Sequence, residues 1–182
     1  TVVNAAGAWA DQIAVLGAVK PLGLVPKRRT AILLNAPPLL DIKDWPLVID
    51  VDEQFYFKPD AGQILLSPAD ETPSVPCDAQ PDEFDIAVAM DRFLKVVDLD
   101  VQTINHRWAG LRTFAPDKTF VVGFDGQAKG FFWLAGQGGY GVQSAPGMAN
   151  LARHLLLKTS LPTGFERVEK SIEAVAPMRM QT

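Results

Sequence analysis

The chain has 182 residues, of which 48% are hydrophobic and 21% are charged, and its net charge at pH 7 is −4. A chain of this length forms one large domain or two small ones and can bury a sizeable core. The slight excess of acidic residues provides no basic surface for nucleic acid, and no apolar run is long enough to span a bilayer. The single cysteine, Cys77, cannot form an internal disulfide and suggests a reducing compartment, so we expect a soluble, cytoplasmic protein.

The first residues predict a strand, a turn and a helix. Val2 and Val3 are typical of the end of a buried strand, and the small residues after them of a tight turn. Apolar residues then recur with helical spacing up to Leu16, where Gly17 is suited to end the helix. This order resembles the last strand–helix step of a larger α/β sheet. The alternative is a domain that simply begins with a strand.

The middle of the chain has the pattern of an antiparallel sheet, with short β-branched or aromatic runs separated by Pro, Asp and Gly. Residues 55–68 predict a hairpin whose turn lies at 59–62. Apolar residues spaced three and four apart predict one helix over about 82–97. Further strands are predicted at 103–114, 119–125 and 130–135. We therefore predict an α+β fold, a mostly antiparallel sheet with a packed helix, flanked at both ends of the chain by pieces of an α/β layer.

A glycine-rich turn is predicted between the last strand and a final helix. Gly136, Gly138 and Gly141 fit G-x-G-x-x-G, but a dinucleotide fingerprint also needs a second parallel strand with an acidic residue about twenty positions on. No such strand is predicted, so we reject an NAD-binding interpretation. The glycines still let the backbone approach a ligand, and the helix behind them directs N–H groups and its positive end at that ligand. The alternative is a turn needed only for packing.

The predicted strand 103–114 carries a candidate anion-binding group. Strand alternation places Trp108, Gly110 and Arg112 on one face. A guanidinium beside an aromatic ring and a bare glycine is suited to bind a carboxylate. The same alternation directs Phe55 and Phe57 to the core and Tyr56 to the other face. The phenol of Tyr56 can therefore add a second hydrogen-bond donor to the same anion. For each residue alone a structural role is the more common explanation. The glycine turn strengthens the case for a binding site, but spacing does not show that the residues meet.

Five segments of the chain stand in a characteristic order and spacing: VVNAAGAWAD (2–11), KRRTA (27–31), FYFKPDAGQILLSPADE (55–71), RWAGLRTFAPD (107–117) and GFFWLAGQGGYGVQSAP (130–146). Together they resemble the C-terminal half of the D-amino-acid oxidase superfamily of FAD-dependent amine oxidoreductases, and most of all its D-arginine dehydrogenase branch. The resemblance weakens after Lys158.

The resemblance implies a division of the chain. Residues 1–20 would end the FAD-binding layer, 21–115 form the substrate-binding sheet, 116–158 return to the FAD-binding layer, and 159–182 form a tail. The family's N-terminal Rossmann half has no counterpart here, so we expect a fragment that alone neither holds FAD nor is active. We also expect an apolar sheet edge at Val2–Val3 and Phe131–Ala135 that promotes self-association.

The resemblance also implies roles for individual residues. Arg112 would bind the substrate carboxylate, assisted by Tyr56 and Arg29, and the carbonyl of Gly139 would receive the substrate amino group. Glycine oxidases carry an arginine where this sequence has Gly139, which favours the D-amino-acid branch. The residues implied to bind the cofactor are Ala6, Gly7, Gly110, Gly138, Gly139, Tyr140, Gly141, Val142 and Gln143.

The implied activity is oxidative deamination of a D-amino acid to a 2-oxo acid and ammonia, with hydride transfer to flavin N5. No metal, nucleic acid or membrane partner is expected, and the electron acceptor is left open. Two alternatives stay open beside it: a glycine- or sarcosine-type amine oxidase of the same superfamily, and a carboxylate-binding module without a redox role.

Overall fold

The computed structural model describes residues 1–101, 103–165, 167 and 172–181, and the chain divides into two compact units. Unit 1 comprises Thr1–Pro26 and Arg112–Thr182, and unit 2 comprises Lys27–Leu111. The strands β2 (Val25–Asn35) and β7 (Ile104–Phe114) carry the chain from one unit to the other. In the described residues no helix is both long and apolar enough to cross a membrane.

Unit 2 is built on one sheet with the strand order β3-β4-β5-β2-β6, in which β7 also pairs with β2. Its pairings of described register are all antiparallel. This confirms the predicted α+β fold with a mostly antiparallel sheet. The remaining strands of the sheet are β3 (Val48–Ile49), β4 (Tyr56–Asp60), β5 (Gln63–Ser67) and β6 (Thr72–Pro73).

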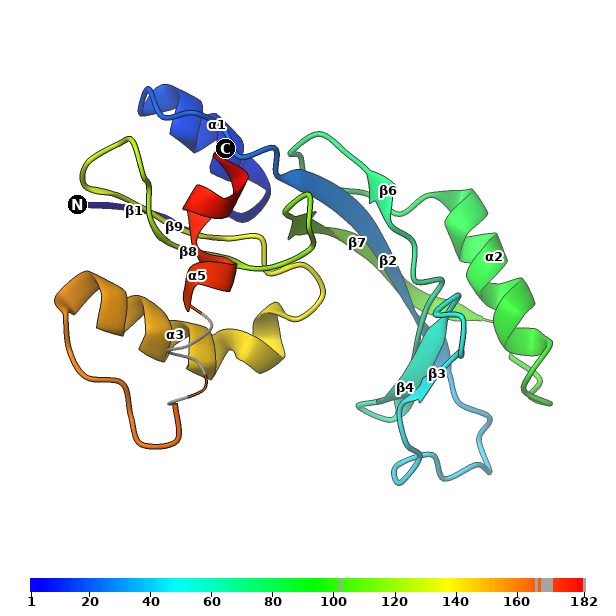
Figure 1. The fold of residues 1–182 in the computed structure, drawn as a ribbon. Coiled ribbons are helices and arrows are strands. Elements are labelled where there is room, and N and C mark those ends of the chain that lie inside the picture. Colours follow the sequence, from blue (N-terminus) through cyan, green and yellow to red (C-terminus); the bar gives the residue numbers. More distant parts are fainter. Residues whose placement is uncertain (102, 166, 168–171, 182) are drawn as a thin grey trace. The chain divides into compact units, whose positions relative to one another are not determined.

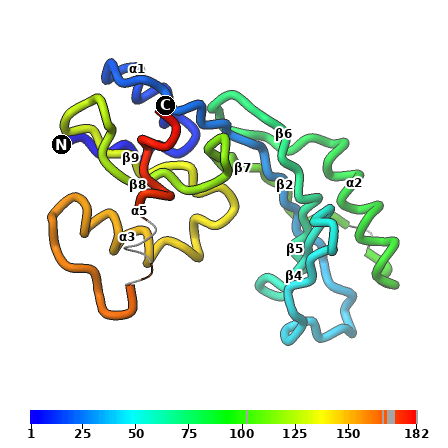
Figure 2. The backbone as a smooth tube through the Cα atoms, in the orientation of Figure 1, coloured from blue at the N-terminus to red at the C-terminus, as the bar shows by residue number. Residues whose placement is uncertain are grey.

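The strands β4 and β5 form the predicted hairpin and lie side by side in the backbone trace (Figure 2). Its turn is tighter than predicted, because Pro59 and Asp60 are still paired with β5. Only Ala61 and Gly62 turn the chain, with φ angles of 49° and 81°. Two successive left-handed residues match the right-handed twist of the flanking strands.

One helix, α2 (Glu83–Leu94), covers one face of this sheet (Figure 1). Asp82 caps its start by accepting a hydrogen bond of 2.9 Å from the backbone N–H of Phe84. The helix ends at Leu94, before the predicted end at about residue 97. Its buried residues pack on the sheet in one core, which includes Ile86, Ala89 and Phe93 from α2 and Ile32, Leu34, Phe57, Ile64 and Leu66 from the strands.

Unit 1 contains a three-stranded sheet in the order β1-β9-β8. The strand β1 (Val2–Asn4) runs parallel to β9 (Phe131–Ala135), and β8 (Val121–Phe124) is antiparallel to β9. Our prediction that 131–135 forms an exposed edge is therefore wrong, because β9 is the central strand and is paired on both sides. Val2 and Val3, on the edge strand β1, are exposed, at 56% and 45%.

Helices cover both faces of this small sheet. On one face α1 (Ala10–Leu16) packs through Ala10 and Ala14 against Phe131 and Trp133. On the other face α3 (Gly141–Leu157) packs through Leu151 and Ala152 against β8 and β9. The expected strand, turn and helix at the start of the chain are confirmed, with the short helix η1 (Gly7–Trp9) before α1. The larger apolar side chains of α1 are exposed, namely Ile13, Val15 and Leu16, and so is Trp9 at the end of η1.

The end of the chain folds back onto β8. After α5 (Ile172–Val175), the short helix η2 (Pro177–Met180) contacts β8, and Arg179 forms an ion pair of 2.7 Å with Asp117. Gln181 donates a hydrogen bond of 2.7 Å to Asp125. The carboxylate of Asp125 also accepts a hydrogen bond from the indole N–H of Trp133. These two acidic residues fasten the described tail to the rest of unit 1.

Candidate functional site

A glycine turn leads from β9 into α3 in unit 1. Gly136 and Gly138 have φ angles of 71° and 52°, a backbone conformation that glycine adopts without strain. The N–H of Gly138 donates a 2.9 Å hydrogen bond to the carbonyl of Thr113 on β7. The N–H of Tyr140 donates one of 3.0 Å to the carbonyl of Gln137. The turn is thus closed on itself and held against the end of β7.

Two side chains of β7 lie against this turn, each over one glycine. A Cβ at Gly139 would come 3.0 Å from Nη1 of Arg112. A Cβ at Gly138 would come 2.6 Å from the ring of Phe114. Arg112 and Phe114 are two residues apart on a strand and so project to the same side. The sequence reasoning missed Phe114, although its i+2 spacing from Arg112 was a usable signal.

Arg112 is half-buried, and within the described residues its side chain has no hydrogen bond and no ion pair. A guanidinium carries five donors in a planar fork and never loses its charge in proteins, so it is suited to receive an anion. Other arginines of the chain are already paired with acidic groups: Arg28, Arg29, Arg107 and Arg179.

The start of α3 presents a second group suited to negative charge. This helix of 17 residues starts at Tyr140 with no capping side chain in the described part of the chain, and Val142 in its first turn is 95% exposed. The first N–H groups of a helix have no acceptor inside it, and the helix dipole adds partial positive charge there. Gly141, Val142 and Gln143 supply these N–H groups. An electron-rich ring or an anion fits this end of the helix.

The segment around Ala6 and Gly7 lies at the same edge of the unit 1 sheet as the glycine turn. Both segments follow the carboxyl ends of β1 and β9, which are paired in parallel. In open α/β sheets, ligands bind outside the carboxyl ends of parallel strands. Gly7 has a φ of 55° and open space where a Cβ would be. Asn4 holds this segment, since its buried amide donates to the carbonyl of Ala10 at 2.8 Å; sequence reasoning did not single out Asn4.

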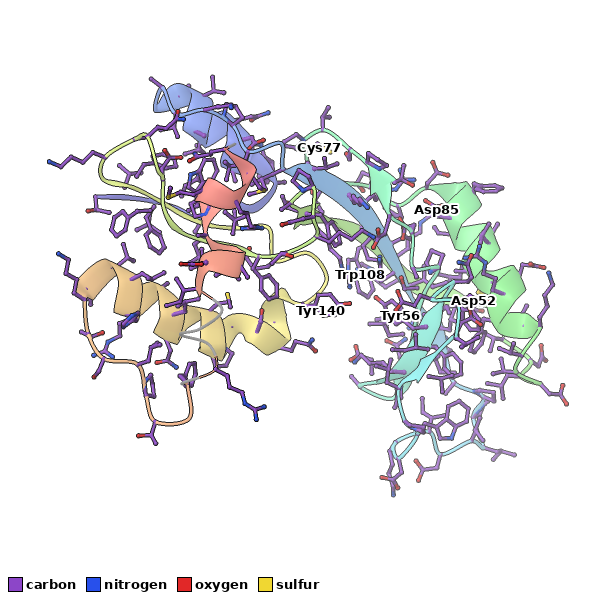
Figure 3. The ribbon with its side chains drawn as sticks, in the orientation of Figure 1. Asp52, Tyr56, Cys77, Asp85, Trp108 and Tyr140 are labelled. Carbon is purple, nitrogen blue, oxygen red and sulfur yellow. The ribbon has the colours of Figure 1, made fainter. Side chains whose placement is uncertain are left out.

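In unit 2 the other predicted residues share one face of the sheet. Phe57 packs edge-on against Phe93 of α2, so its neighbour Tyr56 points away from α2 (Figure 3). Arg28 pairs with Asp85 of α2, so Arg29 points away as well. Arg107 pairs with Glu83 of α2. By the same alternation, its neighbours His106 and Trp108 point away from α2. We name this the distal face: the sheet face opposite α2, carrying Arg29, Tyr56, His106, Trp108 and Gly110.

The residues of the distal face differ in exposure and in the contacts that they already make. The Arg29 side chain is 12% exposed, and its Nε donates a 2.8 Å hydrogen bond to the carbonyl of Asp70. Tyr56 is half-buried on β4, opposite Ser67. At Gly110 a Cβ would meet no atom within 4 Å. The structure thus gathers Arg29, Tyr56 and Gly110 on one face in unit 2, and Arg112, Gly138 and Gly139 at one turn in unit 1.

Comparison with known proteins assigns the family. Residues 1–155 match the model of the family described as FAD dependent oxidoreductase. This chain belongs to that family. FAD is therefore the cofactor of the family to which these two units belong, and the uncapped start of α3 and the glycine turn at the carboxyl edge of β1 and β9 fit such a group.

Solved structures share the fold of this chain. L-proline dehydrogenase from P. horikoshii matches with a TM-score of 0.78 at 23% identity, over 99% of this chain and 46% of its own. Glycine oxidase from Geobacillus kaustophilus matches with a TM-score of 0.75 at 24% identity, over 92% and 44%. L-amino acid deaminase from Proteus vulgaris matches with a TM-score of 0.72 at 19% identity, over 98% and 42%. The chain spans less than half the length of each of these proteins.

Proposed function

We propose that this chain serves an FAD-dependent oxidoreductase that converts D-amino acids to 2-oxo acids and ammonia. The observation that carries the proposal is the half-buried guanidinium of Arg112, which has no partner among the described residues and lies over the bare backbone of Gly139, next to the uncapped start of α3. An amino acid brings a carboxylate and an amino group on one carbon. Arg112 supplies the positive charge for the first, and a carbonyl of the glycine turn can accept a hydrogen bond from the second.

The residues proposed to hold the cofactor lie at the carboxyl edge of β1 and β9. They are Ala6, Gly7 and the segment 138–143. Gly110, on the distal face of unit 2, is proposed as a further cofactor-binding residue. Bare glycines permit close approach of a flat ring, and the N–H groups of Gly141, Val142 and Gln143 favour negative charge on it. When bound, FAD supplies the hydride acceptor.

The proposed work of this chain is positioning. A carboxylate held by the fork of Arg112 loses its rotational freedom, and fixing a reactant in this way accounts for a large part of many enzymatic accelerations. Tyr56 and Arg29 are proposed as further donors to the carboxylate, and the Gly139 carbonyl as acceptor for the amino group. The substrate gives up its Cα hydrogen as hydride and one proton from nitrogen, and water hydrolyses the resulting imino acid to the 2-oxo acid and ammonia.

A second candidate is a glycine- or sarcosine-type amine oxidase, favoured by the fold shared with a glycine oxidase. The space over Gly139 argues against this candidate, because the sequence resemblance places an arginine at this position in glycine oxidases. Here the guanidinium of Arg112 lies 3.0 Å from the position of a Cβ at Gly139, so it would clash with a side chain there. A third candidate is a carboxylate-binding module without redox activity, for which the unpaired Arg112 alone would suffice.

One experiment separates the three candidates. The full-length protein is assayed for reduction of an artificial electron acceptor and for oxygen consumption with paired D- and L-amino acids, glycine and sarcosine. The proposal predicts higher kcat/KM for D-amino acids, with D-arginine included because of the sequence resemblance to that branch. Exclusive activity on L-amino acids, or on glycine and sarcosine, contradicts it. Binding of carboxylates by a colourless protein without turnover supports the third candidate.

A further inference from the structure

The described end of the chain is closely packed on the sheet of unit 1. The helices α5 and η2 both contact β8 (Figure 1). A Cβ at Gly123 would come 3.0 Å from the ring of Pro177. A Cβ at Gly126 would come 2.9 Å from the side chain of Met178. The tail therefore fits here because these two positions are bare. The family match ends at residue 155 and so assigns the tail no role.

Arg179 of this tail is bonded to the loop 115–120, which joins β7 to β8. Its Nε and Nη2 donate to the two carboxylate oxygens of Asp117, at 2.7 Å and 3.1 Å. Nη2 also donates a 2.9 Å hydrogen bond to the carbonyl of Thr119. The Arg179 side chain is only 16% exposed. A bidentate, charge-assisted pair fixes orientation as well as distance, so the tail holds this loop in one position.

The glycine turn rests on the same loop. A Cβ at Gly136, the first residue of the turn, would come 3.6 Å from the carbonyl oxygen of Thr119 and 3.6 Å from the backbone nitrogen of Ala115. The carbonyl of Thr119 is thus in contact with the turn and accepts a hydrogen bond from Arg179. Packed backbone transmits displacement, because protein interiors have few voids and low compressibility. A shift of the loop therefore shifts the glycine turn.

We propose that Arg179 is a positioning residue for FAD, which acts through Asp117 and Thr119 to hold the glycine turn in its ligand-binding position. This inference rests on the proposed function, because it takes the turn and the start of α3 as the cofactor site. A site that is ordered before its ligand arrives loses less conformational freedom on binding, so preorganisation raises affinity. Loss of the Arg179 contacts should therefore weaken FAD binding.

The test measures the Kd for FAD of the full-length protein, stripped of flavin and titrated by flavin fluorescence well below its melting temperature. Arg179→Gln should raise this Kd about tenfold, through lost preorganisation, and Asp117→Asn should raise it as well. Since the two residues form one ion pair, their effects should not add in the double variant. A thermal melt of each apoprotein records stability separately.

The matched control is Gln181→Ala. It removes another hydrogen bond of the tail, 2.7 Å long, to Asp125. Asp125 follows β8, whereas the loop 115–120 precedes it, so this contact lies at the opposite end of the strand from the glycine turn. The control should lower the melting temperature but keep the wild-type Kd. An equal rise of Kd in Gln181→Ala and Arg179→Gln would reflect general loosening of unit 1 and would overturn the inference.

A further variant tests the cofactor site itself. Val142 is exposed in the first turn of α3, where an added carboxylate suits the helix but opposes an electron-rich ring. If Val142→Asp raises the Kd and Arg179→Gln does not, the cofactor site stands and the role of Arg179 is overturned. If no variant changes the Kd, both fail. Should Arg179→Gln not fold, Asp117→Asn against Gln181→Ala decides. The assay uses no substrate, so its result is independent of which amino acid is oxidised.

Discussion

The guanidinium of Arg112 lies over Gly139, with Nη1 only 3.0 Å from where a Cβ would be attached. The two residues are 27 positions apart in the sequence and meet because the glycine turn is hydrogen-bonded to β7 at Thr113. The glycine therefore makes room for the charged group, and the arginine faces backbone rather than an acidic side chain. This arrangement leaves the donors of Arg112 for a ligand.

Replacing Gly139 by alanine should displace Arg112 without unfolding the protein. A Cβ contact of 3.0 Å is too tight, and the atom it meets is the far end of a flexible side chain that can move away. In the full-length enzyme we expect KM for the amino acid to rise about tenfold, because misplacing a positioning group by part of an ångström weakens substrate capture. Steady-state kinetics and a thermal melt of the same sample measure the two effects.

The control for this substitution is Gly147→Ala within α3. A Cβ at Gly147 meets nothing within 4 Å, and alanine favours a helix over glycine by about 1 kcal/mol. This control should keep the wild-type KM and be at least as stable as wild type. Equal KM values for Gly139→Ala and wild type would show that the position of Arg112 does not matter for substrate capture.

The neighbouring glycine should respond differently, through stability. At Gly138 a Cβ would lie 2.6 Å from the Phe114 ring, in a backbone conformation with a φ of 52°. Backbone strain and overpacking together should lower the free energy of unfolding by about 2–4 kcal/mol, measured by urea denaturation. Gly130→Ala is the matched control, because its φ of 81° imposes a similar strain but no atom lies within 4 Å. Equal losses in both variants would mean that the contact with Phe114 contributes nothing.

Local patterns were sufficient to predict much of the fold and the chemistry of single residues. Alternation along 103–114 separated Arg107, which pairs with Glu83 of α2, from His106 and Trp108, whose rings stack on one another. Polar Asp82 before an apolar helical pattern marked the start of α2 closely. Such features depend on a few neighbouring residues, and the sequence contains those neighbours.

Long-range relationships could not be predicted in the same way. Residues 131–135 are uniformly apolar, a pattern that fits both an exposed edge strand and a buried central strand. The pairing of Val2 with Phe131 decides between these two alternatives. The contact of Gly139 with Arg112 also depends on how the glycine turn meets β7. Spacing along the chain contains no information on either contact.

Stability should fall in mild acid because of two carboxylates that fasten the tail. The hydrogen bond from Arg179 lowers the pKa of Asp117 below its usual 3.8. For Asp125, burial raises the pKa, but hydrogen bonds from Trp133 and from backbone N–H groups outweigh it and leave the pKa lowered. Both groups bind protons more readily in the unfolded chain. Their contribution is therefore complete above about pH 5 and is lost as the pH falls through 4 toward the lower folded pKa values.

The measurement is the midpoint of thermal unfolding between pH 6 and pH 3 for wild type and Asp117→Asn. The variant should be slightly less stable at pH 6 and should lose less stability on acidification, because one of the two proton-linked groups is gone. Arg179→Gln should flatten the profile in the same direction, since it removes the main cause of the lowered pKa. Profiles that run parallel in all three proteins would contradict this assignment.

The central claim is that Arg112 binds the carboxylate of a D-amino acid, and Arg112→Ala in the full-length enzyme tests it most directly. The variant is compared with Arg153→Ala, an exposed arginine on α3, by kcat/KM for the best D-amino acid and by flavin absorbance after gel filtration. The substrate carboxylate loses its charge-assisted partner in this variant. The resulting fall in kcat/KM should correspond to about 2–5 kcal/mol of lost transition-state stabilisation, while flavin content stays at the wild-type level. A near-normal kcat/KM in Arg112→Ala would contradict the claim.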